Sequence, residues 1–421
     1  MSSINLSPVD DIQQRLKALN EKSSYQSSFN PDVYRKISRI WKKHNISNFL
    51  LEAPFQNISE IAGCQNCYQA FQMDTYGEGC IHDCFYCFAK HTLEATHQWN
   101  NPLPKAADIS RLWEIFYTVF ETDKPSPWRS LLESKASLRI GGLSDSFMMM
   151  EKEYGISKEF LQILNHYQYP FFVVTKSPLI AEDQYLKLLD PKLSAVHLSL
   201  PSTNENALKI IEPHAPSAQK RLRTLSKLRQ ANIWTTVRIN PLFPCYKDGH
   251  FSQENKDINE PVELDIFNFS MLDEIAQTGT KSVIAGLVHL EEKNIPANLP
   301  LKNKLFSMMK DPSSHQFLYS QEEVMCFYSE IQKYTHKLNM KFNTCYLGSG
   351  EANFFKYKKF HDNKNDCCDV ISSVKEHTST SKANINKFFH AEKQNNILTK
   401  IMTKLAIKII NYIHQKIGEQ K

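Results

Sequence analysis

Short apolar runs alternate with amphipathic stretches along most of the chain between residues 71 and 290. The runs are rich in β-branched and aromatic residues and are bounded by polar or glycine-containing segments, which predicts buried strands. Six strands are expected, at residues 71–76, 137–140, 170–174, 195–200, 233–239 and 282–287, and residues 341–345 are a candidate for one more.

The stretches between these runs carry apolar residues at the i, i+3, i+4, i+7 spacing of a helix. Helices are expected at residues 105–120, 157–167, 179–189, 221–229, 321–338 and 396–417. Strands that alternate with helices favour right-handed βα units and a parallel sheet. We therefore predict an α/β fold, a partial (β/α)6 TIM-type barrel with an N-terminal extension and an α-rich C-terminal extension. In such barrels the reactive groups collect at the carboxyl ends of the strands.

The domain organisation follows from the same pattern. Residues 1–60 are polar and read as an N-terminal extension, residues 61–290 as the core barrel, and residues 291–372 as a C-terminal extension with several cysteines. Residues 373–421 are expected to form a linker and a basic amphipathic helix. The chain has a formal net charge of +5, and residues 374–421 hold nine lysines against three glutamates.

The composition is that of a globular protein, with 41% hydrophobic and 23% charged residues among 421. No apolar run approaches the ~20 residues that a membrane-spanning helix needs, and the N-terminus lacks the pattern of a secretory signal. The ten cysteines fall largely in closely spaced groups. Such groups in a chain of this size favour metal ligation in a reducing compartment, so we expect a cytoplasmic protein without a membrane span.

Three of these cysteines, Cys80, Cys84 and Cys87, lie on one short loop after the first strand. Cysteine thiolates hold iron–sulfur clusters, and four of them are the usual complement. A loop that provides only three leaves one iron with an open coordination site where a small molecule can bind. A zinc site is the poorer alternative, because structural zinc needs four ligands, with CxxC pairs typical.

The spacing Cys-x3-Cys-x-aromatic-Cys, with Tyr86 at the aromatic position, resembles the signature of radical S-adenosylmethionine (SAM) enzymes. Further motifs at residues 141–145, 175–177, 212–217 and 237–242 stand in the order found in the branch that contains spore photoproduct lyase. The resemblance implies a [4Fe–4S] cluster on the three cysteines that binds S-adenosyl-L-methionine. It also implies a reductant such as flavodoxin or ferredoxin, whose electron releases a 5′-deoxyadenosyl radical.

The resemblance further places cofactor contacts at the ends of the strands. Glycine lets the backbone approach a ligand closely, and a lysine there can pair with the SAM carboxylate. Ordinary polar groups at a barrel mouth are the alternative for each position, and Glu212 can instead form a salt bridge with Arg221. The expected cofactor-binding residues are Tyr86, Gly141, Gly142, Ser144, Lys176, Ser199, Arg238 and Asn240. No catalytic side chain is singled out.

Five further cysteines are candidates for an auxiliary cluster or a zinc site, with unligated thiols as the alternative. They are Cys64, Cys67, Cys345, Cys367 and Cys368. The chain also departs from spore photoproduct lyase, which returns a hydrogen atom from a cysteine downstream of its cluster loop. Here no cysteine lies between Cys87 and Cys245.

The substrate class expected from the resemblance and from the charge distribution is nucleic acid, DNA or RNA, acted on by hydrogen abstraction in repair or modification. Basic and aromatic residues alternate over residues 354–360, which suits contacts to phosphates and stacked bases. Two alternatives remain open. One is a radical SAM enzyme that acts on a peptide or small metabolite with an auxiliary cluster. The other is a non-enzymatic, metal-stapled nucleic-acid-binding protein.

Overall fold

The computed structural model describes most of the predicted core. It covers residues 55–57, 67–94, 99, 104–243, 246–247, 250–251, 266–288, 295, 297, 299, 321–345, 357–363 and 365–378. The expected C-terminal helix, most of the N-terminal extension and Cys64 lie outside these ranges.

A central sheet of eight strands in the order β1-β2-β5-β6-β7-β8-β11-β12 organises the molecule. All neighbouring strands are parallel except the edge pair β1–β2. The strands are β1 Gln56–Asn57, β2 Phe71–Met73, β5 Leu138–Ile140, β6 Phe171–Thr175, β7 Ser194–Ser199, β8 Trp234–Leu242, β11 Ser282–Leu287 and β12 Lys341–Thr344. The predicted α/β class and partial barrel are confirmed, and the sheet stays open between its edges β1 and β12.

All six expected strands are present, and the candidate at residues 341–345 is the seventh parallel strand, β12. β12 pairs with β11, so the sheet continues past residue 290, where we expected the core barrel to end. Two antiparallel pairs lie outside the sheet, β3 Tyr76–Gly77 with β4 Lys105–Ala106 and β9 Tyr246–Lys247 with β10 His250–Phe251.

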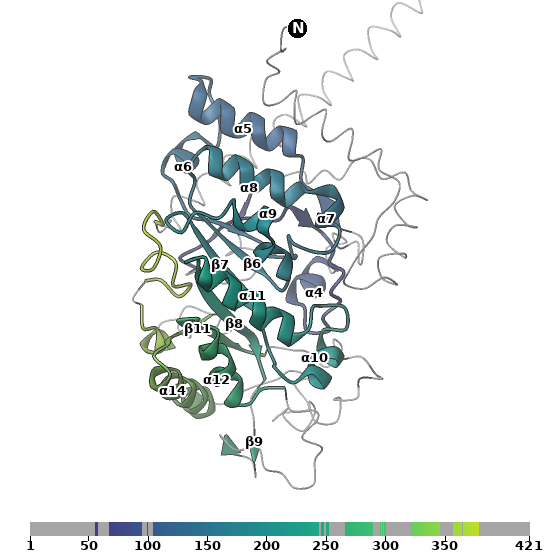
Figure 1. Ribbon diagram of the computed structural model, residues 1–421, viewed down its shortest axis with the longest axis vertical. Coiled ribbons are helices and arrows are strands. Elements are labelled where there is room, and N and C mark those ends of the chain that lie inside the picture. Colours follow the sequence, from purple (N-terminus) through teal and green to yellow (C-terminus); the bar gives the residue numbers. More distant parts are fainter. Residues whose placement is uncertain are drawn as a thin grey trace, which may run out of the picture.

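The helices connect successive strands. The longer ones are α5 Ile109–Glu121, α8 Ile156–His166, α11 Ala218–Gln230, α12 Ser270–Gln277 and α14 Gln321–Lys337, and the short ones α4 Phe88–Glu94, α6 Arg129–Glu133, α7 Glu151–Tyr154, α9 Asp183–Leu186 and α10 Glu205–Ile211. Figure 1 shows α5 and α8 at one end of the molecule and α12 and α14 at the other. Within the described ranges no helix combines the length and the apolar character needed to cross a membrane.

The helix expected at residues 179–189 is wrong as a continuous element. The structure has a 3-10 turn, Pro178–Ala181, followed by the short helix α9. Ser177 accepts a hydrogen bond from the backbone N–H of Leu179 and Pro178 opens the turn, while Glu182 between the two pieces is extended with ψ 147°. One extended residue ends the helical hydrogen bonding although the apolar spacing continues across it.

Alternate residues of the strands pack on opposite faces of the sheet, as the period of two requires. In β6, Phe171 and Val173 pack in the large core beneath α5 and α8. Phe172 and Val174 pack on the other face against buried residues of the segment 367–374. The face that the helices leave uncovered is therefore closed, at this position, by the C-terminal extension.

Candidate functional site

The cysteine loop lies between β3 and α4, above the carboxyl ends of the strands. Cys84 is buried, and Cys80 and Cys87 are partly buried. Burial, followed by the nearby charges of Asp145 and Cys87, raises the pKa of the Cys80 thiol to about 12. Cys84 is also influenced by both neighbouring thiols, so the three sulfur atoms lie close together. Three soft donors on one loop, with no fourth from the loop itself, fit the ligand set of a cluster that keeps one iron open.

The cysteine loop can also be compared with a site that binds a single metal ion. In the part of the chain that the structure describes, no three His, Cys, Asp or Glu side chains are grouped as ligands of one metal ion. Each thiolate ligand of a [4Fe–4S] cluster binds a different iron atom, so cluster ligands do not converge on a point as zinc ligands do. The loop therefore fits a cluster better than zinc.

Backbone contacts fasten the cysteine loop to the strand ends. The hydroxyl of Ser144 donates to the carbonyl of Gly79 at 2.7 Å, which ties the start of the loop to the segment after β5. The N–H of Phe85 donates to the carbonyl of Ile211 at 3.3 Å, which ties its far side to the end of α10. Ser144, expected at the cofactor, thus positions the loop.

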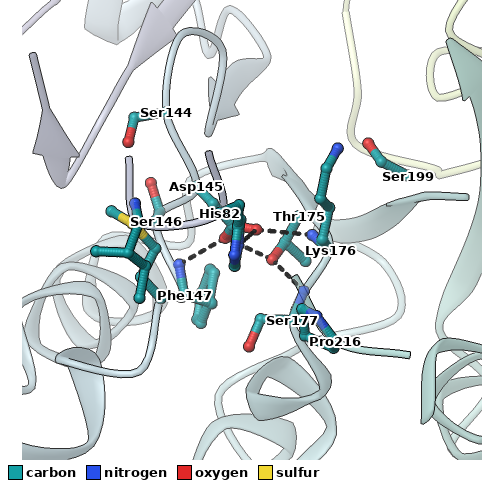
Figure 2. A network of polar contacts seen from close by, with 12 residues as sticks. His82, Ser144, Asp145, Ser146, Phe147, Thr175, Lys176, Ser177, Ser199 and Pro216 are labelled. Carbon is teal, nitrogen blue, oxygen red and sulfur yellow. Dashed lines mark hydrogen bonds and ion pairs between the residues drawn. The ribbon is translucent and has the colours of Figure 1, made fainter. Parts of the chain in front are cut away.

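Asp145 is the centre of a buried polar network (Figure 2). Its carboxylate lies 3.0 Å from Nε2 of His82 and accepts hydrogen bonds from the hydroxyl of Thr175 at 2.6 Å and the N–H of Lys176 at 2.8 Å. Burial alone would raise the pKa of Asp145, but His82 and Thr175 lower it to about 2. One ionised carboxylate therefore links the cysteine loop, the segment after β5 and the end of β6. His82 is buried and points inward to Asp145.

Glu212, directly after α10, forms a second buried network beside the cysteine loop. Its carboxylate accepts a hydrogen bond from the hydroxyl of Tyr86, forms an ion pair with Arg221, and lies 3.3 Å from Nζ of Lys176. Burial would raise the pKa of Glu212, but Arg221 and Lys176 lower it to about 2. The Glu212–Arg221 salt bridge considered from the sequence is present, and it brings Tyr86 and Lys176 together.

Arg221 extends this network to the neighbouring strand. The side chain is fully buried, and it donates to the carbonyls of Ser199 and Pro216, both at 2.9 Å. Ser199, at the end of β7, is therefore held through its backbone carbonyl. Asn240, which we expected to contact the cofactor, lies in β8 with its side chain toward Gly286.

The two glycines after β5 have a structural explanation that differs from the expected close approach to a ligand. Gly141 has φ +87°, and a Cβ there would stand 2.2 Å from the carbonyl oxygen of Val174. A Cβ on Gly142 would meet the side chain of Gln72. The N–H of Gly142 donates to Asp74 at 2.8 Å. Packing within the protein thus accounts for both glycines.

Asp74 is a site residue that sequence reasoning missed. It follows β2 and accepts backbone hydrogen bonds from three successive residues after β5, Gly142, Leu143 and Ser144. Burial raises the pKa of Asp74 to about 6 although these hydrogen bonds lower it. The available signal was an acidic residue inside the run predicted as a strand at residues 71–76.

Arg238 has partners that differ from those expected. Its guanidinium lies 3.2 Å from Nδ1 of His197, 3.0 Å from Sγ of Cys345 and 4.0 Å from Sγ of Cys368. Cys367 is influenced electrostatically by Cys345, Cys368 and Cys67. Four of the five candidate auxiliary cysteines are therefore gathered, and the fifth lies outside the described residues. Cys326 is exposed on α14 and remote from this group.

Of the segment 354–360 considered for nucleic-acid contacts, residues 354–356 lie outside the described residues, and residues 357–360 are partly engaged elsewhere. Tyr357 and Phe360 are buried in the core with Tyr328. Lys358 donates to the side chain of Asn365 at 2.8 Å. These two aromatic rings are consequently not available as stacking platforms for bases.

The comparisons with known proteins found one family model and curated relatives of low identity. The model of the Radical SAM superfamily matches residues 75–251, which run from just before β3 to β10. An uncharacterised protein of Acidianus two-tailed virus is 24% identical over 275 residues, 64% of this chain and 83% of the relative. An uncharacterised protein of Methanocaldococcus jannaschii is 26% identical over 175 residues, 41% of this chain and 61% of the relative.

Similarity to two solved structures is at low identity and with TM-scores below 0.5. A spore photoproduct lyase mutant with bound AdoMet and dinucleoside spore photoproduct has a TM-score of 0.47 at 12% identity, covering 76% of this chain and 95% of that chain. SuiB of Streptococcus suis bound to its precursor peptide SuiA has a TM-score of 0.42 at 14% identity, covering 83% and 62%.

Proposed function

We propose that this chain, whose residues 75–251 match the Radical SAM superfamily, is a radical SAM enzyme that holds a [4Fe–4S] cluster through Cys80, Cys84 and Cys87 and cleaves S-adenosylmethionine reductively. When bound, the cluster and SAM supply a 5′-deoxyadenosyl radical that abstracts a hydrogen atom from the substrate. The observation that carries this proposal is the close grouping of three buried or half-buried thiols on a loop anchored to the strand ends, inside the region that matches the superfamily.

In this proposal the residues around the cysteine loop provide positive charge and hold the loop in position. Burial would lower the pKa of Lys176, but Glu212 and Cys84 raise it, so the side chain keeps its positive charge. A fixed cation beside the loop favours the anionic cluster and the SAM carboxylate. Glu212 orients both Lys176 and Tyr86, and Asp145 fixes the loop to β6 through His82. Ser199 and Asn240, at the ends of adjacent strands, remain candidates for contacts to SAM.

Nucleic acid is the first candidate substrate. Its support is the positive charge of residues 374–421 together with the sequence resemblance to the spore photoproduct lyase branch. A base in a duplex has to leave the stack before it reaches a radical inside an enzyme, so single-stranded or damaged DNA is the expected form. The buried rings of Tyr357 and Phe360 do not contribute to this support.

A peptide or small metabolite is the second candidate substrate. The observation in its favour is the group formed by Cys67, Cys345, Cys367 and Cys368, which suits an auxiliary cluster. The two candidates differ in their dependence on ionic strength, because phosphate contacts release counterions and weaken steeply with added salt.

The test is the yield of 5′-deoxyadenosine from SAM under anaerobic reduction, with and without single-stranded DNA, at about 50 mM and 200 mM salt. A nucleic-acid substrate predicts that DNA increases the yield and that the higher salt abolishes the increase. An unchanged yield with DNA at both salt concentrations would reject this substrate class. Deuterium transfer from labelled DNA into 5′-deoxyadenosine would identify the abstracted hydrogen.

A further inference from the structure

Cysteines from three distant parts of the chain meet on the sheet face that the helices do not cover. Cys345 directly follows β12, and its N–H donates to the carbonyl of Ala285 at 2.8 Å, which continues the pairing with β11. Cys367 and Cys368 belong to the segment that packs against Phe172 and Val174 of β6. Both are buried, with 6% and 2% of their surface exposed.

Cys67 joins the group from the other side. It precedes β2, and the adjacent Tyr68 packs against the apolar cluster that contains Cys367 and Cys368 and donates to the side chain of Asn365 at 3.2 Å. Cys67 also packs against a small apolar cluster formed by Ala89, Leu93 and Leu143, which Cys87 of the cysteine loop contacts as well. The group therefore lies near the cysteine loop and shares none of its thiols.

A buried cation accompanies the group. Arg238 is 3% exposed, and its guanidinium donates to Sγ of Cys345 and Sγ of Cys368. The guanidinium also lies 3.2 Å from Nδ1 of His197. Burying an unpaired guanidinium is costly, so a negative charge on these sulfur atoms is what the site requires.

Metal ligation supplies that negative charge, because cysteine binds metals as thiolate. Zinc would need four donors within about 2.3 Å of one point. No three such side chains converge on one point among the described residues. An iron–sulfur cluster is larger than a single zinc ion, and its thiolates bind different iron atoms. It therefore suits cysteines that lie near one another but do not point at one position.

We infer that Cys67, Cys345, Cys367 and Cys368 bind a second iron–sulfur cluster, with Arg238 as the hydrogen-bonding cation that stabilises its thiolates. A cluster with four thiolates and a 2+ core carries a net charge of −2. Hydrogen bonds and positive charge at the sulfur atoms favour that charge and raise the reduction potential. Arg139 of β5, whose charge also reaches Cys368, supplies further compensation.

This site does not depend on the proposed function, and a variant of the cysteine loop separates the two. In the full-length protein carrying Cys80→Ala, Cys84→Ala and Cys87→Ala, the proposed catalytic cluster has no ligands. After anaerobic reconstitution with iron and sulfide, we expect this variant to keep about two to four irons per chain with an equal amount of acid-labile sulfide. Adding Cys345→Ser and Cys368→Ser should remove them, whereas adding Cys326→Ser, on exposed α14, should not.

Alkylation of the reconstituted triple variant, mapped by mass spectrometry, gives a second readout that needs no further substitution. The inference predicts that Cys345, Cys367 and Cys368 are protected from iodoacetamide while Cys326 reacts, and that a chelator removes the protection. No iron with sulfide in the triple variant would overturn the inference. Zinc, or iron without sulfide, would overturn it equally, as would unchanged iron after Cys345→Ser and Cys368→Ser.

Discussion

Glu212 and Asp145 are the two buried carboxylates at the strand ends, and their contact partners differ. Asp145 lies among the ring of His82, the hydroxyl of Thr175 and a backbone N–H, whereas Glu212 balances two cations, Arg221 and Lys176. The two carboxylates and the two cations are buried or nearly so. Removing one partner from a buried ion pair costs far more than the pair contributes, because it leaves an uncompensated charge.

Glu212→Gln should therefore lower the free energy of unfolding of the apoprotein by about 3–5 kcal/mol. The matched control is Tyr86→Phe, which removes one hydroxyl donor to the same carboxylate and is expected to cost about 1 kcal/mol. Urea denaturation followed by circular dichroism measures both values. Equal losses in the two variants would show that Glu212 does not compensate Arg221 and Lys176.

At the scale of elements, the close approach of β5 to β6 depends on one backbone position. Gly141 has a left-handed φ, and a Cβ there would collide with the backbone of Val174. Gly155 provides a comparison, since it has φ +63° but nothing within 4 Å of an added Cβ. The two positions share the conformational requirement and differ in packing.

We predict that Gly155→Ala lowers the free energy of unfolding by about 1–2 kcal/mol, the cost of a left-handed conformation for an L-residue. Gly141→Ala should cost clearly more, since the strand ends must also separate. Thermal melting of the two variants side by side gives the comparison. Similar melting temperatures would mean that β5 and β6 can move apart freely.

Glu151 at the start of α7 joins several elements through one carboxyl group. It accepts hydrogen bonds from the hydroxyls of Tyr76 at 2.8 Å and Tyr185 at 3.1 Å and from the N–H groups of Ser157 and Lys158. Burial raises the pKa of Glu151 from 4.5 to about 7 in spite of these hydrogen bonds. The folded state consequently holds a proton that the unfolded state releases above about pH 4.5.

A raised carboxyl pKa makes the folded state less stable as the pH increases. Between pH 4.5 and pH 7 the contribution of Glu151 should decrease the free energy of unfolding by roughly 2–3 kcal/mol. In Glu151→Gln this part of the pH dependence should be absent, although the variant is less stable at low pH. Urea denaturation at both pH values, compared with the wild type, measures the difference. Parallel pH profiles would contradict the raised pKa.

For the whole molecule, the strands and the cysteine loop could be predicted because each depends on residues near in sequence. Buried apolar runs located all seven parallel strands, and the spacing of Cys80, Cys84 and Cys87 indicated the cluster loop. The break before α9 was missed, because the apolar spacing continues through an extended residue.

The partners of the site residues were harder to predict. Arg238 contacts Cys345, which is 107 positions away, and only the parallel pairing of β8, β11 and β12 brings them together. Gly142 likewise faces Gln72 on a strand that is distant in sequence but adjacent in space. Local patterns specify elements, whereas these contacts depend on strand order.

The measurement that tests the central claim most directly is the formation of 5′-deoxyadenosine from SAM by the anaerobically reconstituted and reduced full-length protein. We predict formation in the wild type and in Cys326→Ala, whose cysteine is exposed on α14, and none in Cys84→Ala. Loss of activity together with loss of about four irons per chain in Cys84→Ala, with an unchanged melting temperature of the apoprotein, would locate the reaction at the cysteine loop. Formation of 5′-deoxyadenosine by Cys84→Ala, or none by the wild type with a full complement of iron, would contradict the account.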